Sequence, residues 1–198
     1  SVWRGGWGRA TARGAERWLA AAELKISGDH NLANALAALA MGQALGLRRE
    51  GMQAALREFG GLAHRTALVR ERGGVRWFDD SKGTNVGATV AAVRGLPGPV
   101  VLIAGGDGKG QDFSPLRAAL AHKARAVTLI GRDAPLIAAA LGDEVPVHRA
   151  ADLDAAVALA ARLAQPGDSV LLSPACASFD MFSDYAQRGA LFAAAVRR

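Results

Sequence analysis

A glycine-rich segment, residues 105–110, carries a lysine that could bind an anion. Lys109 is one of only four lysines in the chain, and its ammonium is a compact charge suited to a carboxylate or a phosphate. The segment is not a P-loop, because Gly110 follows Lys109 where a serine or threonine is required, and Ile103 occupies the first glycine position. The dinucleotide-binding fingerprint also fails, since Gln111 stands at its last glycine. An anion-binding loop and a simple tight turn both remain open.

A second polar segment, residues 79–85, begins with two adjacent carboxylates. Alternation along a strand points only one of them at a site, so a pair that shares one proton is not expected. Binding of a ribose is a more ordinary use of an aspartate at a strand end. We expect His64, beside Arg65, to be structural and Cys176 to be an inert buried thiol. No cluster has the spacing of zinc ligands, so no metal site is predicted.

Both polar segments fall where predicted strands end. After residue 62, apolar runs alternate with helical patterns, which is typical of a parallel sheet with helices on both faces. The expected strands are 75–78, 99–104, 126–130, 145–148 and 169–172. The expected helices are 85–94, 114–121, 134–141, 152–164 and 180–196. Polar or glycine-rich loops follow four strands, at 79–85, 105–110, 131–133 and 173–178. Because ligands of open α/β sheets bind beyond the carboxyl ends of the strands, we predict an α/β fold with a ligand site at that edge.

A Gly60-Gly61 pair separates this alternating region from two helical patterns. Periodic leucines predict a helix from about residue 29 to 45, and a second helix is expected from 49 to 59. Residues 1–26 are rich in glycine and indicate an irregular region with weak strand character. The expected domain boundary therefore divides the chain into residues 1–61 and residues 62–198.

The composition excludes several classes of protein. Hydrophobic residues make up 51% of the 198 positions, which excludes a disordered tail, and one cysteine excludes a disulfide framework. No apolar run is long enough for a membrane span, and no signal peptide is recognisable, so we expect a cytoplasmic location. The net charge of +6 comes from arginines that rise together with alanines, as in GC-rich genomes. Basic residues without interleaved aromatic platforms do not predict a nucleic-acid partner.

Six segments occur together in an order that resembles the Mur ligase family of peptidoglycan synthesis. They are Gly28-Asp-His-Asn-Leu-Ala-Asn34, Leu62-Ala-His-Arg65, Asp79-Asp-Ser-Lys-Gly-Thr-Asn85, Gly105-Gly-Asp-Gly-Lys109, Leu171-Leu-Ser-Pro-Ala-Cys-Ala-Ser178 and Gln187-Arg-Gly189. The resemblance covers residues 26–198 and is strongest to the members that add D-glutamate. It implies a Rossmann-like C-terminal glutamate-ligase domain over 62–198. It also implies that residues 1–61 are a helical remnant, the end of a central ATPase domain.

The resemblance also implies a reaction. The family uses ATP and Mg2+ to convert the carboxylate of UDP-N-acetylmuramoyl-L-alanine to an acyl phosphate, which the amine of D-glutamate attacks. The family's P-loop and magnesium ligands would lie upstream of residue 1, so we expect the chain to be inactive alone. A monomeric, cytoplasmic enzyme without nucleic-acid partners is expected.

Site residues follow from the resemblance position by position. Lys82 matches a catalytic lysine at the substrate junction. The positions that match ATP-binding residues are Asn34, Arg65 and Asp80. The positions that match D-glutamate-binding residues are Thr84, Lys109, Ser178, Phe179 and Tyr185. Tyr185 stands where better-known members have phenylalanine.

Two other functions remain as alternatives. Another Mur ligase or a folylpolyglutamate-type ligase would share the fold and differ in the amino acid that it binds. A stand-alone ligand-binding module would share the fold without the phosphate chemistry, because the sequence contains no P-loop motif.

Overall fold

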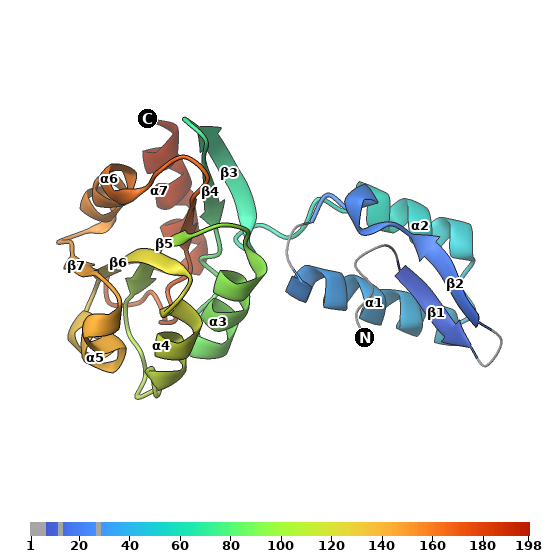
Figure 1. Cartoon of the computed structure of the whole chain (residues 1–198), viewed down its shortest axis with the longest axis horizontal. Coiled ribbons are helices and arrows are strands. Elements are labelled where there is room, and N and C mark those ends of the chain that lie inside the picture. The colour runs from blue at the N-terminus through green and yellow to red at the C-terminus, as the bar shows by residue number, and fades with distance from the viewer. Residues whose placement is uncertain (1–6, 12–13, 27–28) are drawn as a thin grey trace. The chain divides into compact units, whose positions relative to one another are not determined.

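In the computed structural model, the chain divides into two units, residues 1–61 and residues 62–198 (Figure 1). The structure describes residues 7–11, 14–26 and 29–198. Among these residues, none of the helices combines the length and the apolar character that crossing a membrane requires.

The first unit contains a hairpin as well as the two expected helices. Its elements are β1 (Trp7–Thr11), β2 (Gly14–Leu19), the short 3-10 helix η1 (Ala21–Glu23), α1 (Asp29–Ala44) and α2 (Arg49–Glu58). The strands β1 and β2 pair antiparallel, so the expected strand character is confirmed at residues 7–11 and 14–19, whereas the expected irregularity is wrong there. Residues 20–26 contain η1 and no strand, and the part of the expectation at 1–6 and 12–13 lies outside the described residues. Glycine and small residues have a low β propensity, which weakens the sequence pattern of a strand here. Pairing of the two segments satisfies their backbone N–H and C=O groups.

The helices α1 and α2 contact each other through a small residue. A Cβ atom added at Gly42 would lie 2.5 Å from the sulfur of Met52, which is closer than contact allows. Among the residues of this unit whose burial is described, 18–26 and 31–61, the buried apolar residues are Leu19, Ala35 and Leu39. Leu36 of α1 and Leu45 and Leu47 after it are exposed, as expected for a small core.

The second unit is a six-stranded sheet in the order β3-β4-β8-β5-β6-β7. The strands are β3 (Ala67–Arg72), β4 (Val75–Asp79), β5 (Val100–Gly105), β6 (Ala124–Ile130), β7 (Val147–Arg149) and β8 (Ser169–Leu172). All neighbouring pairs are parallel except β3 with β4. The helices are α3 (Val86–Gly95), α4 (Ser114–Leu120), α5 (Ala134–Leu141), η2 (Gly142–Glu144), α6 (Leu153–Leu163) and α7 (Tyr185–Arg197). The predicted α/β class with a mostly parallel sheet is confirmed.

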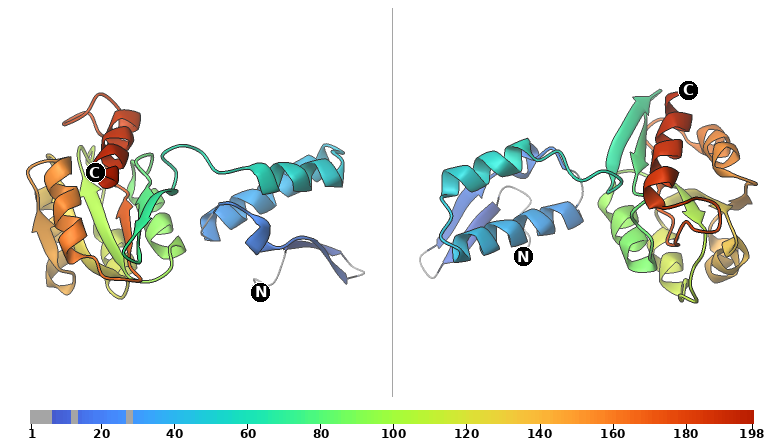
Figure 2. Two further views of the ribbon diagram at one scale, coloured as in Figure 1. Left: turned by 90° about the horizontal axis from the view of Figure 1, so that it is seen from above. Right: turned by 180° about the vertical axis from the view of Figure 1, so that it is seen from behind.

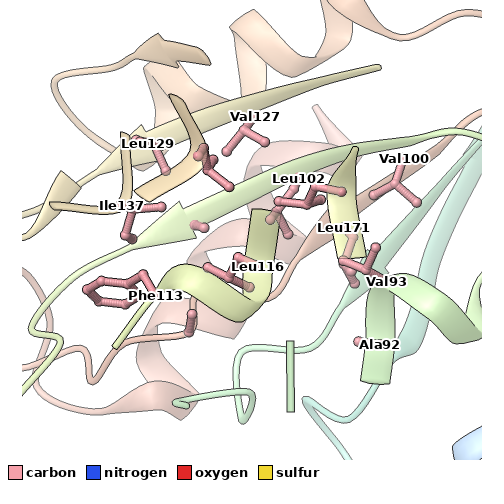
Figure 3. Close-up of a cluster of buried hydrophobic side chains, with 14 of the residues drawn as sticks. Ala92, Val93, Val100, Leu102, Phe113, Leu116, Val127, Leu129, Ile137 and Leu171 are labelled. Carbon is pink, nitrogen blue, oxygen red and sulfur yellow. The ribbon is translucent and has the colours of Figure 1, made fainter. Parts of the chain in front are cut away.

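Helices cover both faces of this sheet because the central strands are apolar on both sides. Leu102 and Leu171 face α3, α4 and α5 in one cluster (Figure 3). Val101 and Val170 face α6 and α7 in the other. Figure 2 shows α6 in orange and α7 in red next to each other. Successive side chains along each strand therefore point alternately into the two core layers.

Two features of this unit differ from the sequence expectation. The edge strand β3 was not expected, because half of its residues are charged; the Gly73-Gly74 turn that pairs it with β4 is the signal that could have found it. The last helix starts at Tyr185 instead of residue 180. Asp184 caps it by accepting a hydrogen bond from the backbone N–H of Gln187 at 2.7 Å.

Candidate functional site

Four loops meet at the carboxyl edge of the sheet, because β4, β8, β5 and β6 are neighbours there. They are the segments that follow these strands, beginning at residues 80, 173, 106 and 131. Backbone hydrogen bonds join them directly: Asp107 and Ala177 exchange bonds of 3.0 and 2.8 Å, and the N–H of Asp133 donates to the carbonyl of Gly106 at 3.0 Å. The structure thus brings together the polar loops that the sequence places at this edge.

Asp80 is buried directly after β4 and ties two segments together. One carboxylate oxygen accepts hydrogen bonds from the backbone N–H of Thr66 at 3.0 Å and from its hydroxyl at 3.2 Å. The other accepts the hydroxyl of Ser173 at 2.7 Å. Burial raises the pKa of Asp80 from 3.8 to about 6, although these hydrogen bonds oppose the shift. Only 7% of Asp80 is exposed, so contact with a ribose stays a prediction.

The neighbouring carboxylate of Asp79 has different partners. Its Oδ2 lies 2.7 Å from Nδ1 of His64, and its Oδ1 accepts the N–H of Ser81 at 2.9 Å. This contact needs Gly189 of α7, because a Cβ atom there would lie 2.2 Å from the same imidazole nitrogen. The two aspartates therefore hold separate partners, and a purely structural role for His64 stays a prediction.

Arg188 of α7 is a buried cation that holds two loops. Its Nε donates to the hydroxyl of Ser81 at 2.9 Å, and one Nη donates to the carbonyl of Ser81 at 2.9 Å. Both Nη atoms also reach the carbonyl of Cys176 at 3.3 Å. Burial lowers the pKa of Arg188 to about 10, which leaves the guanidinium charged near neutral pH. Arg188 therefore fixes the loop after β4 against the loop after β8.

Two lysines project from this framework over aromatic rings. The ammonium of Lys82 lies 3.8 Å from the ring centroid of Tyr185, and that of Lys109 lies 5.8 Å from the centroid of Phe179. Both lysines are exposed, and Phe179 is 68% exposed. Exposed cations after β4 and β5, on the two sides of β8, suit a ligand that carries carboxylates or phosphates.

The other predicted site residues occupy different surroundings. Thr84 is half-buried in the loop after β4, and Ser178 is buried beside the Asp107–Ala177 bridge. Arg65 is exposed in the segment before β3. Asn34 is exposed on α1, in the unit of residues 1–61. In residues 7–11, 14–26 and 29–198, no group of three His, Cys, Asp or Glu residues could hold a metal ion.

Sequence reasoning did not assign roles to Arg188 or to Asp133, whose carboxylate accepts the N–H of Gly108 at 2.7 Å. Both hold backbone groups of other loops, and Arg188 also binds the hydroxyl of Ser81; the sequence holds no periodic signal for such contacts. The structure agrees with the expectation that the thiol of Cys176 is inert, because Cys176 is fully buried and burial raises its pKa to about 12.

Comparison with protein families gives a match over this same unit. The family model "Mur ligase, glutamate ligase domain" matches residues 64–176. The chain is 62% identical over 189 residues to the UDP-N-acetylmuramoylalanine--D-glutamate ligase of Aromatoleum aromaticum, covering 94% of this chain and 41% of the relative. It is 59% identical over 185 residues to the protein of that name from Pseudomonas aeruginosa, covering 91% and 41%. The chain thus spans about two fifths of the length of the curated relatives it matches.

Solved structures share the fold at low sequence identity. The folylpolyglutamate synthase of Mycobacterium tuberculosis, complexed with ADP and AMPPCP, matches with a TM-score of 0.66 and 20% identity, over 85% of this chain and 41% of that one. UDP-N-acetylmuramate-alanine ligase from Thermotoga maritima matches with a TM-score of 0.64 and 19% identity, over 88% and 39%.

Proposed function

This chain belongs to the Mur ligase family, and we propose that it forms the C-terminal part of a ligase that adds D-glutamate to UDP-N-acetylmuramoyl-L-alanine. Curated relatives with that activity in their names support the proposal at about 60% identity. The complete enzyme would consume ATP and act in the cytoplasm during peptidoglycan synthesis. Residues 62–198 would be the glutamate-ligase domain, and residues 1–61 the end of the central ATPase domain.

The observation that carries this proposal is the pairing of Lys109 with the segment that contains Ser178 and Phe179. The Asp107–Ala177 bridge joins the two loops, and the ammonium of Lys109 lies over the ring of Phe179. A dicarboxylic amino acid needs a cation and hydroxyl donors at one place, and this edge offers Lys109, Thr84 and Ser178. Charge-assisted hydrogen bonds from such groups are about twice as strong as neutral ones.

In the proposed reaction, ATP phosphorylates the alanyl carboxylate, and the D-glutamate amine then attacks the acyl carbon. The new C–N bond forms, the C–O bond to phosphate breaks, and the amine loses a proton as phosphate leaves. Lys109, Thr84 and Ser178 would hold the two D-glutamate carboxylates, with Phe179 and Tyr185 lining the same place. Lys82 would stabilise charge at the junction of the substrates. These residues act by positioning and electrostatics, which supply much of the rate enhancement in such transfers.

The nucleotide would be contacted by Asn34, Arg65 and Asp80 of this chain. The sequence contains no P-loop motif, so the phosphates of the nucleotide would be bound by residues that this chain does not contain. The family uses Mg2+. Among residues 7–11, 14–26 and 29–198, no group of three His, Cys, Asp or Glu residues could hold such an ion.

A chimeric enzyme tests the proposal. The matching segment of the A. aromaticum relative is replaced by this chain, and ligation is assayed with ATP and UDP-N-acetylmuramoyl-L-alanine. D-glutamate is compared with L-glutamate, L-lysine and diaminopimelate as the added amino acid. The control is the 198-residue chain alone, which should form no product because phosphoryl transfer needs a phosphate-binding loop.

We expect product with D-glutamate only, and only in the chimera. Ligation of a diamino acid in place of D-glutamate would make the chain part of another Mur ligase. Product formation by the chain alone would overturn the proposal that it is an incomplete enzyme.

A further inference from the structure

The loop after β6, Gly131-Arg132-Asp133, contacts both ligand loops, although the proposed mechanism assigns it no role. It touches the glycine loop that carries Lys109 and the segment that carries Ser178. A Cβ atom at Gly131, whose φ is +78°, would lie 2.6 Å from Oδ2 of Asp180 and 2.7 Å from the Cα of Gly106. Three loops therefore meet at a point where only glycine fits.

Asp133 holds the glycine loop through its backbone. Its own N–H donates to the carbonyl of Gly106 at 3.0 Å, and its Oδ2 accepts the N–H of Gly108 at 2.7 Å. Gly108 immediately precedes Lys109. Asp133 thus fixes both ends of a three-residue segment whose next residue is the lysine.

Arg132 acts on the same lysine through Asp107. The guanidinium of Arg132 pairs with Oδ1 of Asp107, and that oxygen also accepts the N–H of Lys109 at 3.0 Å. Lys109 has a φ of +51°, a left-handed conformation that is uncommon for a residue with a side chain. Arg132 also donates its backbone N–H to Asp180 at 2.9 Å, two residues after Ser178.

We propose that Arg132 and Asp133 are positioning residues for the bound amino acid. They hold the backbone of Lys109 in its left-handed conformation and at a fixed place relative to the segment of Ser178. The inference rests on the proposed function, because it assumes that Lys109 and Ser178 bind one dicarboxylic ligand. Neither residue touches that ligand in this proposal.

Amide hydrogen exchange on the 198-residue chain tests the structural half without any ligand. Asp133→Ala removes the acceptor of Gly108, and Arg132→Ala removes the partner of Asp107. Both should speed exchange at Gly108 and Lys109. The matched controls are Asp152→Ala, which removes a carboxylate that caps α6 at 2.8 Å, and Arg149→Ala, an exposed arginine at the end of β7. Unchanged exchange at Gly108 in both test variants would overturn the inference.

Kinetics of the chimeric enzyme test the functional half. Asp133→Ala should raise the KM for D-glutamate by about tenfold, as expected for loss of about one well-placed interaction, with kcat and the KM for ATP within about twofold. Asp133→Asn should restore a KM near the unsubstituted value, because its amide oxygen can still accept from Gly108. Asp152→Ala and Arg149→Ala should leave the KM for D-glutamate unchanged.

The kinetic outcomes distinguish failure of the positioning role from failure of the proposed function. An unchanged KM for D-glutamate in Asp133→Ala, or an equal rise for ATP, would overturn the positioning role. Failure of the unsubstituted chimera to ligate D-glutamate would overturn the proposed function, and the exchange measurement would still decide whether Arg132 and Asp133 hold the loop.

Discussion

Lys82 and Tyr185 lie 103 positions apart in the sequence, yet the ammonium of Lys82 sits 3.8 Å from the centroid of the Tyr185 ring. The contact joins the loop after β4 to the first residue of α7. Buried hydrogen bonds hold the same two segments together. The hydroxyl of Ser81 donates to the carbonyl of Tyr185 at 2.7 Å, and Arg188 donates to the same hydroxyl. A buried network therefore positions an exposed cation.

The ring of Tyr185, and not its hydroxyl, should matter for Lys82. In the chimeric enzyme, Tyr185→Phe should leave kcat within about twofold, because a phenyl face still attracts the ammonium. Tyr185→Leu should lower kcat by roughly twofold to thirtyfold, since a cation–π contact contributes about 0.5–2 kcal/mol. Phe59→Leu, at an exposed ring of the other unit, is the control for loss of an aromatic side chain. Equal rates for Tyr185→Leu and the unsubstituted enzyme would refute the positioning of Lys82 by this ring.

Stability should depend on pH through Asp80. Its pKa in the folded protein, about 6, is above the ordinary 3.8, so the folded state binds the proton more tightly than the unfolded state. The stabilising contribution is complete below about pH 4 and is lost as the pH rises through 6. The loss amounts to about 3 kcal/mol, because the folded-state pKa lies about 2 above its ordinary value and a pKa difference of 1 corresponds to about 1.4 kcal/mol.

Asp80→Asn should remove this dependence, because an amide stays neutral while keeping an oxygen for Thr66. The variant should be more stable than the unsubstituted chain at pH 8 and similar to it at pH 4. Urea unfolding followed by circular dichroism measures both, with the exposed Asp143→Asn as control. If the difference between Asp80→Asn and the unsubstituted chain does not change with pH, the carboxylate is not protonated near pH 6.

Substitution of Lys109 or Ser178 should raise the KM for the amino acid more than the KM for the nucleotide. In the chimeric enzyme, Lys109→Ala and Ser178→Ala should raise the KM for D-glutamate by roughly tenfold to hundredfold, as expected for hydrogen bonds to a charged group worth about 1.5–3 kcal/mol. Lys109→Arg should not rescue, because a planar guanidinium needs more room than an ammonium. Steady-state kinetics with each substrate varied in turn provide the measurement. A rise in the KM for ATP alone would make residues 105–110 a nucleotide loop.

Residues 62–198 should fold without the preceding unit. The whole six-stranded sheet and both of its core layers lie within them, and about 137 residues can bury a sufficient core. Limited proteolysis should cut near Gly60 and leave a resistant core that begins before Ala67, where β3 starts. A resistant core that begins after Trp77 would show that β3 and β4 are not part of the stable sheet.

The sequence alone determined the class of fold, because that class depends on local patterns. Continuous apolar runs such as residues 100–104, each followed by a helical pattern, require a sheet covered on both faces, and the structure has it. The positions of the polar loops followed from the same alternation. Weak local signals gave the errors: the charged strand β3, the hairpin of β1 and β2, and the start of α7.

Only the tertiary structure decided which side chains meet. The strand order places β8 between β4 and β5, so Asp80 reaches Ser173 and Lys109 lies over Phe179, across separations that no sequence period encodes. Burial, too, is a property of the whole fold: it raises the pKa of Asp80 although the sequence around this residue is polar. Periodicity specifies the faces of each element, whereas contacts and electrostatics depend on how distant elements pack together.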